Sequence, residues 1–124
     1  MTLKGLLLTL MLATLPAVSN ATQLLRQPAL HGDTLVFTYA NDIWKTSING
    51  GTAQRLTSFQ GSESQPVISP DGNYIAFTGE YEGNRDVFVV SVNGGEPQRL
   101  TYHPGADAAV GWSPDSQQVL FSSA

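Results

Sequence analysis

The sequence has no cysteine and only two histidines, His31 and His103. Without cysteine the chain can form no disulfide, no thiolate metal site and no cysteine nucleophile. Two histidines are too few for a multi-histidine metal site, so we expect no metal and no other cofactor. Charged residues are scarce as well, at 13% of the chain, where an average soluble protein has about 25%.

Positively charged residues are fewer than negatively charged ones. Six lysines and arginines oppose ten acidic residues, and the formal net charge is −4. Binding to nucleic acid requires a basic surface, so we expect no nucleic-acid partner. An apolar fraction of 41% with so little charge is typical of β-rich secreted or periplasmic proteins rather than of disordered chains.

The N-terminus has the pattern of a secretory signal peptide, which we place at residues 1–21. Lys4 precedes an apolar run over residues 6–15, which is shorter than the stretch of about 20 apolar residues that a membrane-spanning helix needs. Ser19 and Ala21 place small residues at positions −3 and −1 of the cleavage site, as signal peptidase requires. We therefore expect a signal helix that is cleaved after Ala21, a periplasmic location and no stable membrane anchor. A buried N-terminal helix is the alternative.

The rest of the chain is a repeat with a period of 44 residues. Residues 41–78 laid on residues 85–122 give 14 identities in 38 positions. A repeat of this size is typical of one four-stranded propeller blade. The recurring segments are Asp42-Ile43-Trp44 with Asp86-Val87-Phe88, Asn49-Gly50-Gly51 with Asn93-Gly94-Gly95, Gln54-Arg55-Leu56-Thr57 with Gln98-Arg99-Leu100-Thr101, and Ser69-Pro70-Asp71 with Ser113-Pro114-Asp115.

Each repeat carries the signals of strands and tight turns in the order of one blade. Pro70, Asp71 and Gly72 indicate a turn, because proline fixes φ, aspartate accepts backbone N–H bonds and glycine adopts positive φ. No stretch of the repeat region shows a sustained helical period of about 3.6 residues, so almost no helix is predicted there. The strands predicted in the second repeat cover residues 66–69, 74–78, 86–92 and 98–102.

We therefore predict an all-β fold, a partial β-propeller of about two and a third four-stranded blades. The blades are expected over residues 29–66, 67–110 and 111–124, after a short lead-in over residues 22–28. A closed propeller has about four to eight blades. We interpret the chain as the front piece of a longer protein, which on its own would expose blade faces that a complete propeller buries.

The repeats resemble the PD40 or WD40-like blades of the TolB-like and tricorn-like families. Ser69-Pro70-Asp71-Gly72 followed by Tyr74-Ile75-Ala76-Phe77 carries this resemblance. Over residues 26–124 the chain resembles more narrowly the N-terminal propeller of the tricorn protease family, whereas TolB carries an α/β domain before its blades. The segments that narrow the resemblance are residues 28–37, Asn41-Asp42-Ile43-Trp44 with Gly50-Gly51 and Arg55-Leu56-Thr57, and residues 99–105 with Gly111-Trp112-Ser113-Pro114-Asp115.

Tricorn-like proteins are serine peptidases. The resemblance implies that this chain is a non-catalytic propeller segment, which gates or channels peptides to a catalytic core further along the parent protein. The family's catalytic serine, histidine and acidic residues lie in that core and match no position here, so we assign no catalytic, cofactor-binding or metal-binding residue. The implied partners are peptides or unfolded protein, the remaining blades and the protease core, in a homo-oligomeric parent.

Two alternatives stay open. A TolB-like propeller would be a periplasmic protein-binding module and not an enzyme. A propeller attached to an α/β-hydrolase peptidase would be followed by a G-x-S-x-G nucleophile elbow. Continuation of the chain into a second propeller, a PDZ-like stretch and a serine-bearing core would favour the tricorn-like interpretation.

Residues that could carry chemistry have structural interpretations as well. His31 and His103 occupy non-equivalent repeat positions, and no serine lies in a nucleophile-elbow pattern. We predict turn or loop hydrogen bonds for both histidines rather than catalysis or metal binding. Recurrence in each blade indicates turn capping for Asp71 and Asp115. For Asp42 and Asp86 we expect bonds to the backbone of a neighbouring blade.

The remaining candidates are aromatic residues, edge arginines and one insertion. Trp44, Phe88 and Trp112 are predicted to pack between blades, with the gripping of a peptide or sugar as the alternative. Arg55 and Arg99 are predicted to be solvated charges on an outer strand. The insertion over residues 80–84 (Glu-Tyr-Glu-Gly-Asn) contains two acids and a tyrosine, and it is either a loop that contacts a basic peptide or a longer solvated turn.

Overall fold

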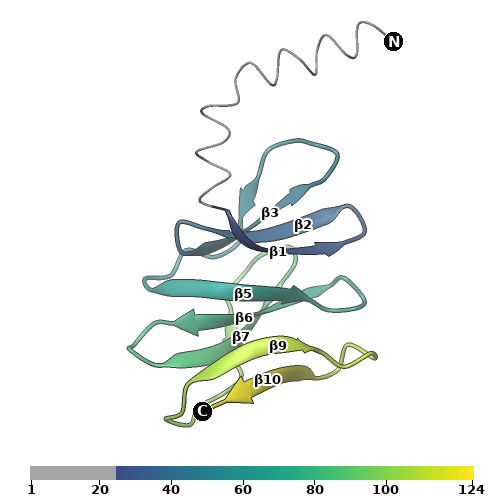
Figure 1. Cartoon of the computed structure of the whole chain (residues 1–124). Coiled ribbons are helices and arrows are strands. Elements are labelled where there is room, and N and C mark those ends of the chain that lie inside the picture. Colours follow the sequence, from purple (N-terminus) through teal and green to yellow (C-terminus); the bar gives the residue numbers. More distant parts are fainter. Residues whose placement is uncertain (1–24) are drawn as a thin grey trace, which may run out of the picture.

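The structure is a computed structural model that describes residues 25–124, so the predicted signal peptide at residues 1–21 lies outside the described residues. Every regular element within residues 25–124 is a β-strand. The strands form three antiparallel sheets that stack face to face (Figure 1). In this part of the chain no helix is long and apolar enough to cross a membrane.

Two sheets are complete four-stranded units and the third has two strands, as expected of a partial propeller. Within the first two sheets the strands follow sequence order, so each strand pairs with the one before it. The first sheet holds β1 (Arg26–His31), β2 (Thr34–Tyr39), β3 (Asp42–Ser47) and β4 (Gln54–Arg55). The second holds β5 (Ser62–Ile68), β6 (Tyr74–Glu80), β7 (Arg85–Ser91) and β8 (Gln98–Arg99), and the third holds β9 (Asp107–Trp112) and β10 (Val119–Ser123).

The sheets begin a few residues earlier than the predicted blade boundaries. β1 begins at Arg26 and β5 at Ser62. Each contains a bulge, where the pairing register shifts at Gln27 and at Gln65, residues with φ of 52° and 55°. A bulge interrupts the alternation of apolar and polar residues. The sequence pattern therefore shows only the half of each strand that follows the bulge.

Successive side chains of a middle strand point to opposite faces of its sheet, so one strand contributes to both interfaces between sheets. In β6, Ile75 and Phe77 pack against the first sheet, whereas Ala76 packs against Ala109 of the third. The interface between the first and second sheets buries more and larger side chains than the other. Its buried residues are Val36, Ile43, Leu56, Ile75, Phe77 and Val90.

The first strands of the three sheets, β1, β5 and β9, follow one another along one side of the stack (Figure 1). Side chains pin these strands to each other across the sheets. The Gln65 backbone N–H donates to Gln27 Oε1 at 2.7 Å. The Ala109 backbone N–H donates to Thr78 Oγ1 at 3.0 Å, and Thr78 in turn donates to Gln65 Oε1 at 2.9 Å. These hydrogen bonds hold neighbouring sheets in a fixed position along the direction of their strands.

Candidate functional site

His103 lies in the loop between β8 and β9, beside a serine and a buried aspartate. Its Nε2 atom is 3.3 Å from Ser123 Oγ and 2.8 Å from Asp107 Oδ2, the latter outside hydrogen-bond geometry. The Gly105 backbone N–H donates to Nδ1 at 3.1 Å. The residue types of a catalytic triad are therefore close together.

The arrangement differs from a triad in the nitrogen that each partner meets. In a Ser-His-Asp triad the carboxylate holds Nδ1–H, and Nε2 takes the proton of the serine. Here Ser123 and Asp107 both face Nε2, and Nδ1 accepts from the backbone of Gly105. In this geometry His103 closes its own loop, which agrees with the predicted loop hydrogen bonding.

His31 connects the first sheet to a turn of the second. Its Nε2 lies 2.8 Å from the Pro70 carbonyl oxygen, to which it donates. The ring covers Gly72, where an added Cβ would lie 2.6 Å from His31 Cε1. Gly72 also has a φ of +78°, so both its backbone and its neighbour require glycine. The prediction of turn hydrogen bonding for His31 is confirmed.

The recurring turn aspartates act on their own turns. Ser69 Oγ donates to Asp71 Oδ1 at 2.6 Å, and the Asn73 backbone N–H donates to the same oxygen at 3.0 Å. The hydrogen bond from Ser69, and to a smaller extent that from Asn73, holds the pKa of Asp71 below its ordinary value. The predicted capping role is confirmed. Asp115 has equivalent donors, Ser113 Oγ at 2.6 Å and the Gln117 backbone N–H at 3.0 Å, and its pKa is lowered for the same reason.

A second recurring group, which we call the clasp, joins the third strand of a blade to the segment after its outer strand. In the second blade it consists of Asp86, Arg99 and Thr101. Arg99 Nη2 lies 2.8 Å from Asp86 Oδ2, and Arg99 Nε donates to the Thr101 carbonyl oxygen at 2.7 Å. The Val87 backbone N–H donates to Thr101 Oγ1 at 3.0 Å. The first blade repeats these contacts with Asp42, Arg55, Thr57 and Ile43.

The contacts of the clasp show that two predictions from the sequence were wrong. Asp42 and Asp86 do not bond to the backbone of a neighbouring blade, because each pairs with an arginine of its own sheet. Arg55 and Arg99 are half-exposed but are not free edge charges, since each donates to a backbone carbonyl and to an aspartate. The spacing of the Asp-Ile-Trp and Gln-Arg-Leu-Thr segments shows that both recur, but it does not show that they meet.

Replacing Thr101 by valine tests the clasp. The change removes the acceptor of the buried Val87 N–H, and we expect a loss of about 1–2 kcal/mol in the free energy of unfolding. Thr101→Ser retains Oγ and is expected to retain most of the stability. Urea denaturation followed by circular dichroism measures both variants. Equal losses in the two would show that the hydroxyl has no role.

A buried glutamate in β5 extends the clasp of the first blade. Glu63 is 2% exposed, and its carboxylate accepts from Thr57 Oγ1, from Tyr81 Oη at 2.6 Å and from the Ile43 backbone N–H at 3.2 Å. Burial raises the pKa of Glu63, and these three donors oppose that rise only in part. Burial and the neighbouring Glu63 carboxylate also raise the pKa of Tyr81.

Sequence reasoning missed Glu63, although a signal was present. Asp107 lies 44 residues later, at the equivalent repeat position, and it is fully buried as well. The two positions share a carboxylate but not an identical residue, so a search for identities passes over them. An acidic residue that recurs on an inner strand would have indicated a buried polar contact.

The insertion after β6 turns two of its side chains inward. The Tyr81 ring packs on Phe88, with ring centroids 4.8 Å apart, and on Phe59 at 5.8 Å. Asn84 Nδ2 lies within hydrogen-bond distance of the His103 and Gly105 carbonyl oxygens, at 3.3 and 3.4 Å. Asn84 therefore braces the loop that contains His103, and Tyr81 packs inward, whereas Glu80, Glu82 and Gly83 are exposed as in a solvated turn. Contact of this insertion with a basic peptide stays a prediction.

The aromatic predictions are confirmed for two of three residues. Trp112 Nε1 donates to the Val67 carbonyl oxygen of the preceding sheet at 2.9 Å. Phe88 packs against the core between the first and second sheets. Trp44 instead meets Tyr39 of its own sheet, edge to face, with ring centroids 6.0 Å apart. Within residues 25–124, no three histidine, aspartate or glutamate side chains are grouped so that they could hold a metal ion.

Stacked four-stranded antiparallel sheets with a repeated turn and a repeated clasp define the chain as part of a β-propeller. The family model for the tricorn protease N-terminal β-propeller domain matches residues 22–124. The chain therefore belongs to the tricorn protease N-terminal β-propeller family.

Individual relatives agree with this assignment. The chain is 37% identical over 59 residues to Tricorn protease homolog 1 of Streptomyces coelicolor, an alignment that covers 48% of this chain and 6% of that protein. A crystal structure of the tricorn protease superposes with a TM-score of 0.67 at 26% identity, over 75% of this chain and 10% of that one. A protein described as TolB from Agrobacterium tumefaciens superposes with a TM-score of 0.67 at 28% identity, over 75% of this chain and 35% of that one.

Proposed function

We propose that this chain is the non-catalytic N-terminal propeller segment of a periplasmic tricorn-like serine peptidase, and that it guides peptides toward a catalytic core carried elsewhere in the parent protein. The match of residues 22–124 to the tricorn N-terminal propeller carries the proposal. The geometry of His103 supports the non-catalytic role, because Ser123 and Asp107 meet the same ring nitrogen. The periplasmic location rests on the signal pattern in residues 1–21.

A TolB-like protein-binding propeller is the second candidate. The TolB structure superposes on this chain as well as the tricorn protease does, with the same TM-score of 0.67. The fold of the blades in this chain therefore does not distinguish the two functions. The family model and the Streptomyces relative favour the peptidase, since both carry the tricorn description.

The non-catalytic role is tested by incubating the 124-residue chain with a mixture of unstructured peptides and analysing the products by mass spectrometry. We expect no cleavage. Cleavage that is lost on His103→Ala would contradict the proposal. Recovery of the exported protein with Thr22 as its first residue would support the location, and recovery with Met1 intact would contradict it.

The guiding role is tested in the parent peptidase with residues 25–124 deleted. We expect cleavage of very short peptides to continue while the range of accepted peptide lengths changes. An unchanged length range would contradict a guiding role. Specific retention of envelope proteins by this chain, without any effect on cleavage, would favour the TolB-like function.

A further inference from the structure

A cavity of about 310 Å³ lies between the insertion after β6 and the strands β7 and β8. Its wall combines aromatic rings with carboxylates and one arginine. All of the residues that line it belong to the second blade, and they are Tyr81, Glu82, Asn84, Asp86, Phe88 and Arg99.

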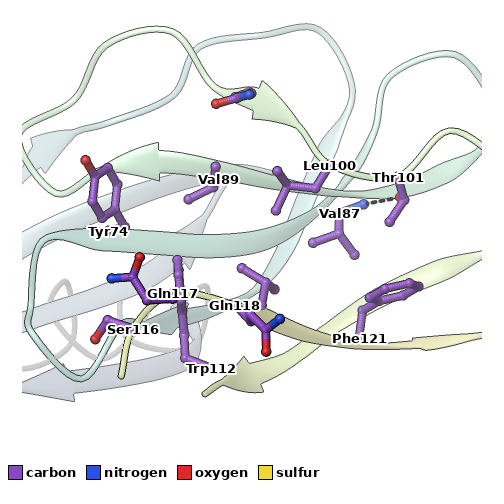
Figure 2. Close-up of a pocket in the computed structure, with 12 residues that line it drawn as sticks. Tyr74, Val87, Val89, Leu100, Thr101, Trp112, Ser116, Gln117, Gln118 and Phe121 are labelled. Atoms are coloured by element: carbon purple, nitrogen blue, oxygen red, sulfur yellow. Dashed lines mark hydrogen bonds between the residues drawn. The ribbon is translucent and has the colours of Figure 1, made fainter. Parts of the chain in front are cut away.

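The cavity lies on the face of the second sheet that is turned toward the first sheet. Phe88 packs against the core between these two sheets, and Arg99 pairs directly opposite Phe88 and so shares its face. Figure 2 shows the other face, where Val89 and Leu100 lie toward Trp112 of the third sheet. The first and second sheets have four strands each. The cavity is therefore a feature of two complete blades.

Two glycines make room for the aromatic part of the wall. A Cβ added at Gly79 would lie 2.9 Å from Tyr81 Cε2 and 3.0 Å from Phe88 Cδ1, and one added at Gly61 would lie 3.0 Å from Tyr81 Cδ1. The first sheet has Tyr39 at the pairing position of Gly79, and the first repeat lacks the insertion. The aromatic wall is therefore particular to the second blade.

The charges that line the cavity sum to a negative value. Asp86 and Arg99 offset each other, because their side chains form an ion pair of 2.8 Å. Glu82 is exposed and has no ion-pair partner among residues 25–124. The same neighbourhood already holds one guanidinium between a carboxylate and a ring, since Arg99 also lies 4.7 Å from the centroid of the Tyr102 ring. A second cation would find a free carboxylate and aromatic surface in the cavity.

We propose that this cavity binds the cationic side chain, arginine or lysine, of a peptide from a separate polypeptide. The charged group lies beside Glu82, and the aliphatic stem covers the rings of Tyr81 and Phe88. Such a cation is attracted both by the carboxylate and by the aromatic rings. The formal net charge of −4 on the chain favours the approach of a basic peptide. The site needs only the second blade, so it is independent of whether the parent protein is a peptidase or a TolB-like binding protein.

The probe is the pentapeptide Ala-Ala-Arg-Ala-Ala, acetylated and amidated at its ends. The control peptide has citrulline in place of arginine, which retains the length and shape of the side chain but not its charge. Titration of the isotope-labelled 124-residue chain, followed by two-dimensional NMR spectra, measures both the affinity and the position of binding. We expect the largest shift changes at the backbone amides of Glu82, Asn84 and Arg99, and about threefold or more weaker binding of the citrulline peptide.

Two protein variants separate the cavity from the general negative charge of the insertion. Glu82→Gln and Glu80→Gln remove the same charge from exposed positions, but only Glu82 lines the cavity. We expect Glu82→Gln to weaken binding of the arginine peptide by about two- to fivefold. Glu80→Gln is expected to leave it nearly unchanged. Circular dichroism confirms that both variants fold as the unmodified chain does.

Three results would overturn the proposal. The first is equal affinity for the arginine and citrulline peptides, because the cavity would then not recognise charge. The second is equal weakening by Glu82→Gln and Glu80→Gln, which would show that the acidic surface attracts the peptide without a defined site. The third is a set of shift changes that lies away from the residues lining the cavity.

Discussion

Phe77→Ala is expected to lower the free energy of unfolding by about 3–5 kcal/mol, the range measured for large aromatic residues removed from protein cores. Phe77 is fully buried, and it lies in the cluster that joins the first sheet to the second. Its loss removes the stacking partner of Phe88 and leaves a cavity that β-sheet backbone cannot close by a small shift. Urea denaturation, with circular dichroism as the readout, measures the change.

Phe121→Ala is the matched control, because Phe121 occupies the same position in the next repeat but is 46% exposed. We expect it to cost less than about 1 kcal/mol, as is common for exposed positions. Should Phe77→Ala leave no folded protein, Phe77→Leu provides a milder change at the same site. Equal losses for Phe77→Ala and Phe121→Ala would contradict the described packing between sheets.

The sequence predicts the elements that repeat, because a repeat makes each local signal visible more than once. The turn at Ser69-Pro70-Asp71-Gly72 is an example, since its proline, aspartate and glycine each have a local function. The segment Arg85–Ser91 is another, because its β-branched and aromatic residues favour a strand whatever surrounds it. Local chemistry decides such elements, and a sequence displays local chemistry directly.

The contacts that the sequence does not predict are those made across long separations. Arg99 and Asp86 are 13 positions apart and meet only because the outer strand folds back on β7. Lys45 Nζ donates to the Val92 carbonyl oxygen at 2.6 Å across 47 positions, which depends on how two sheets stack. The inward orientation of Tyr81 depends likewise on a buried partner, Glu63, in another strand. Such contacts follow from packing, which residue types alone do not determine.

Glu63→Ala is expected to lower the free energy of unfolding by about 3 kcal/mol. The change leaves the Tyr81 and Thr57 hydroxyls without their shared acceptor, whereas the Ile43 N–H keeps Thr57 Oγ1 at 2.9 Å. A buried polar group without a partner costs about 1–3 kcal/mol, and relaxation around the new cavity recovers part of the total. Tyr81→Phe removes only one donor and is expected to cost less than half as much under the same denaturation conditions.

The buried carboxylate of Glu63 also makes stability depend on pH in a definite direction. Burial raises its pKa above the ordinary value of 4.5, so between 4.5 and the raised pKa the folded chain binds more protons than the unfolded chain. Stability from this group therefore falls as the pH rises through that window. Asp71 and Asp115 have lowered pKa values, so their contribution is lost only as the pH falls below 3.8.

The two pH effects can be separated with Glu63→Gln, which removes the titration at that position and leaves the turn aspartates in place. We expect the free energy of unfolding of the unmodified chain, measured relative to that of Glu63→Gln, to increase as the pH is lowered from 8 to about 5. Tyr81→Phe retains the carboxylate and is expected to retain this pH dependence. A difference between the unmodified chain and Glu63→Gln that stays constant with pH would mean that Glu63 has the same pKa in both states. The three hydrogen-bond donors would then offset the whole effect of burial, in contradiction to the raised pKa of Glu63.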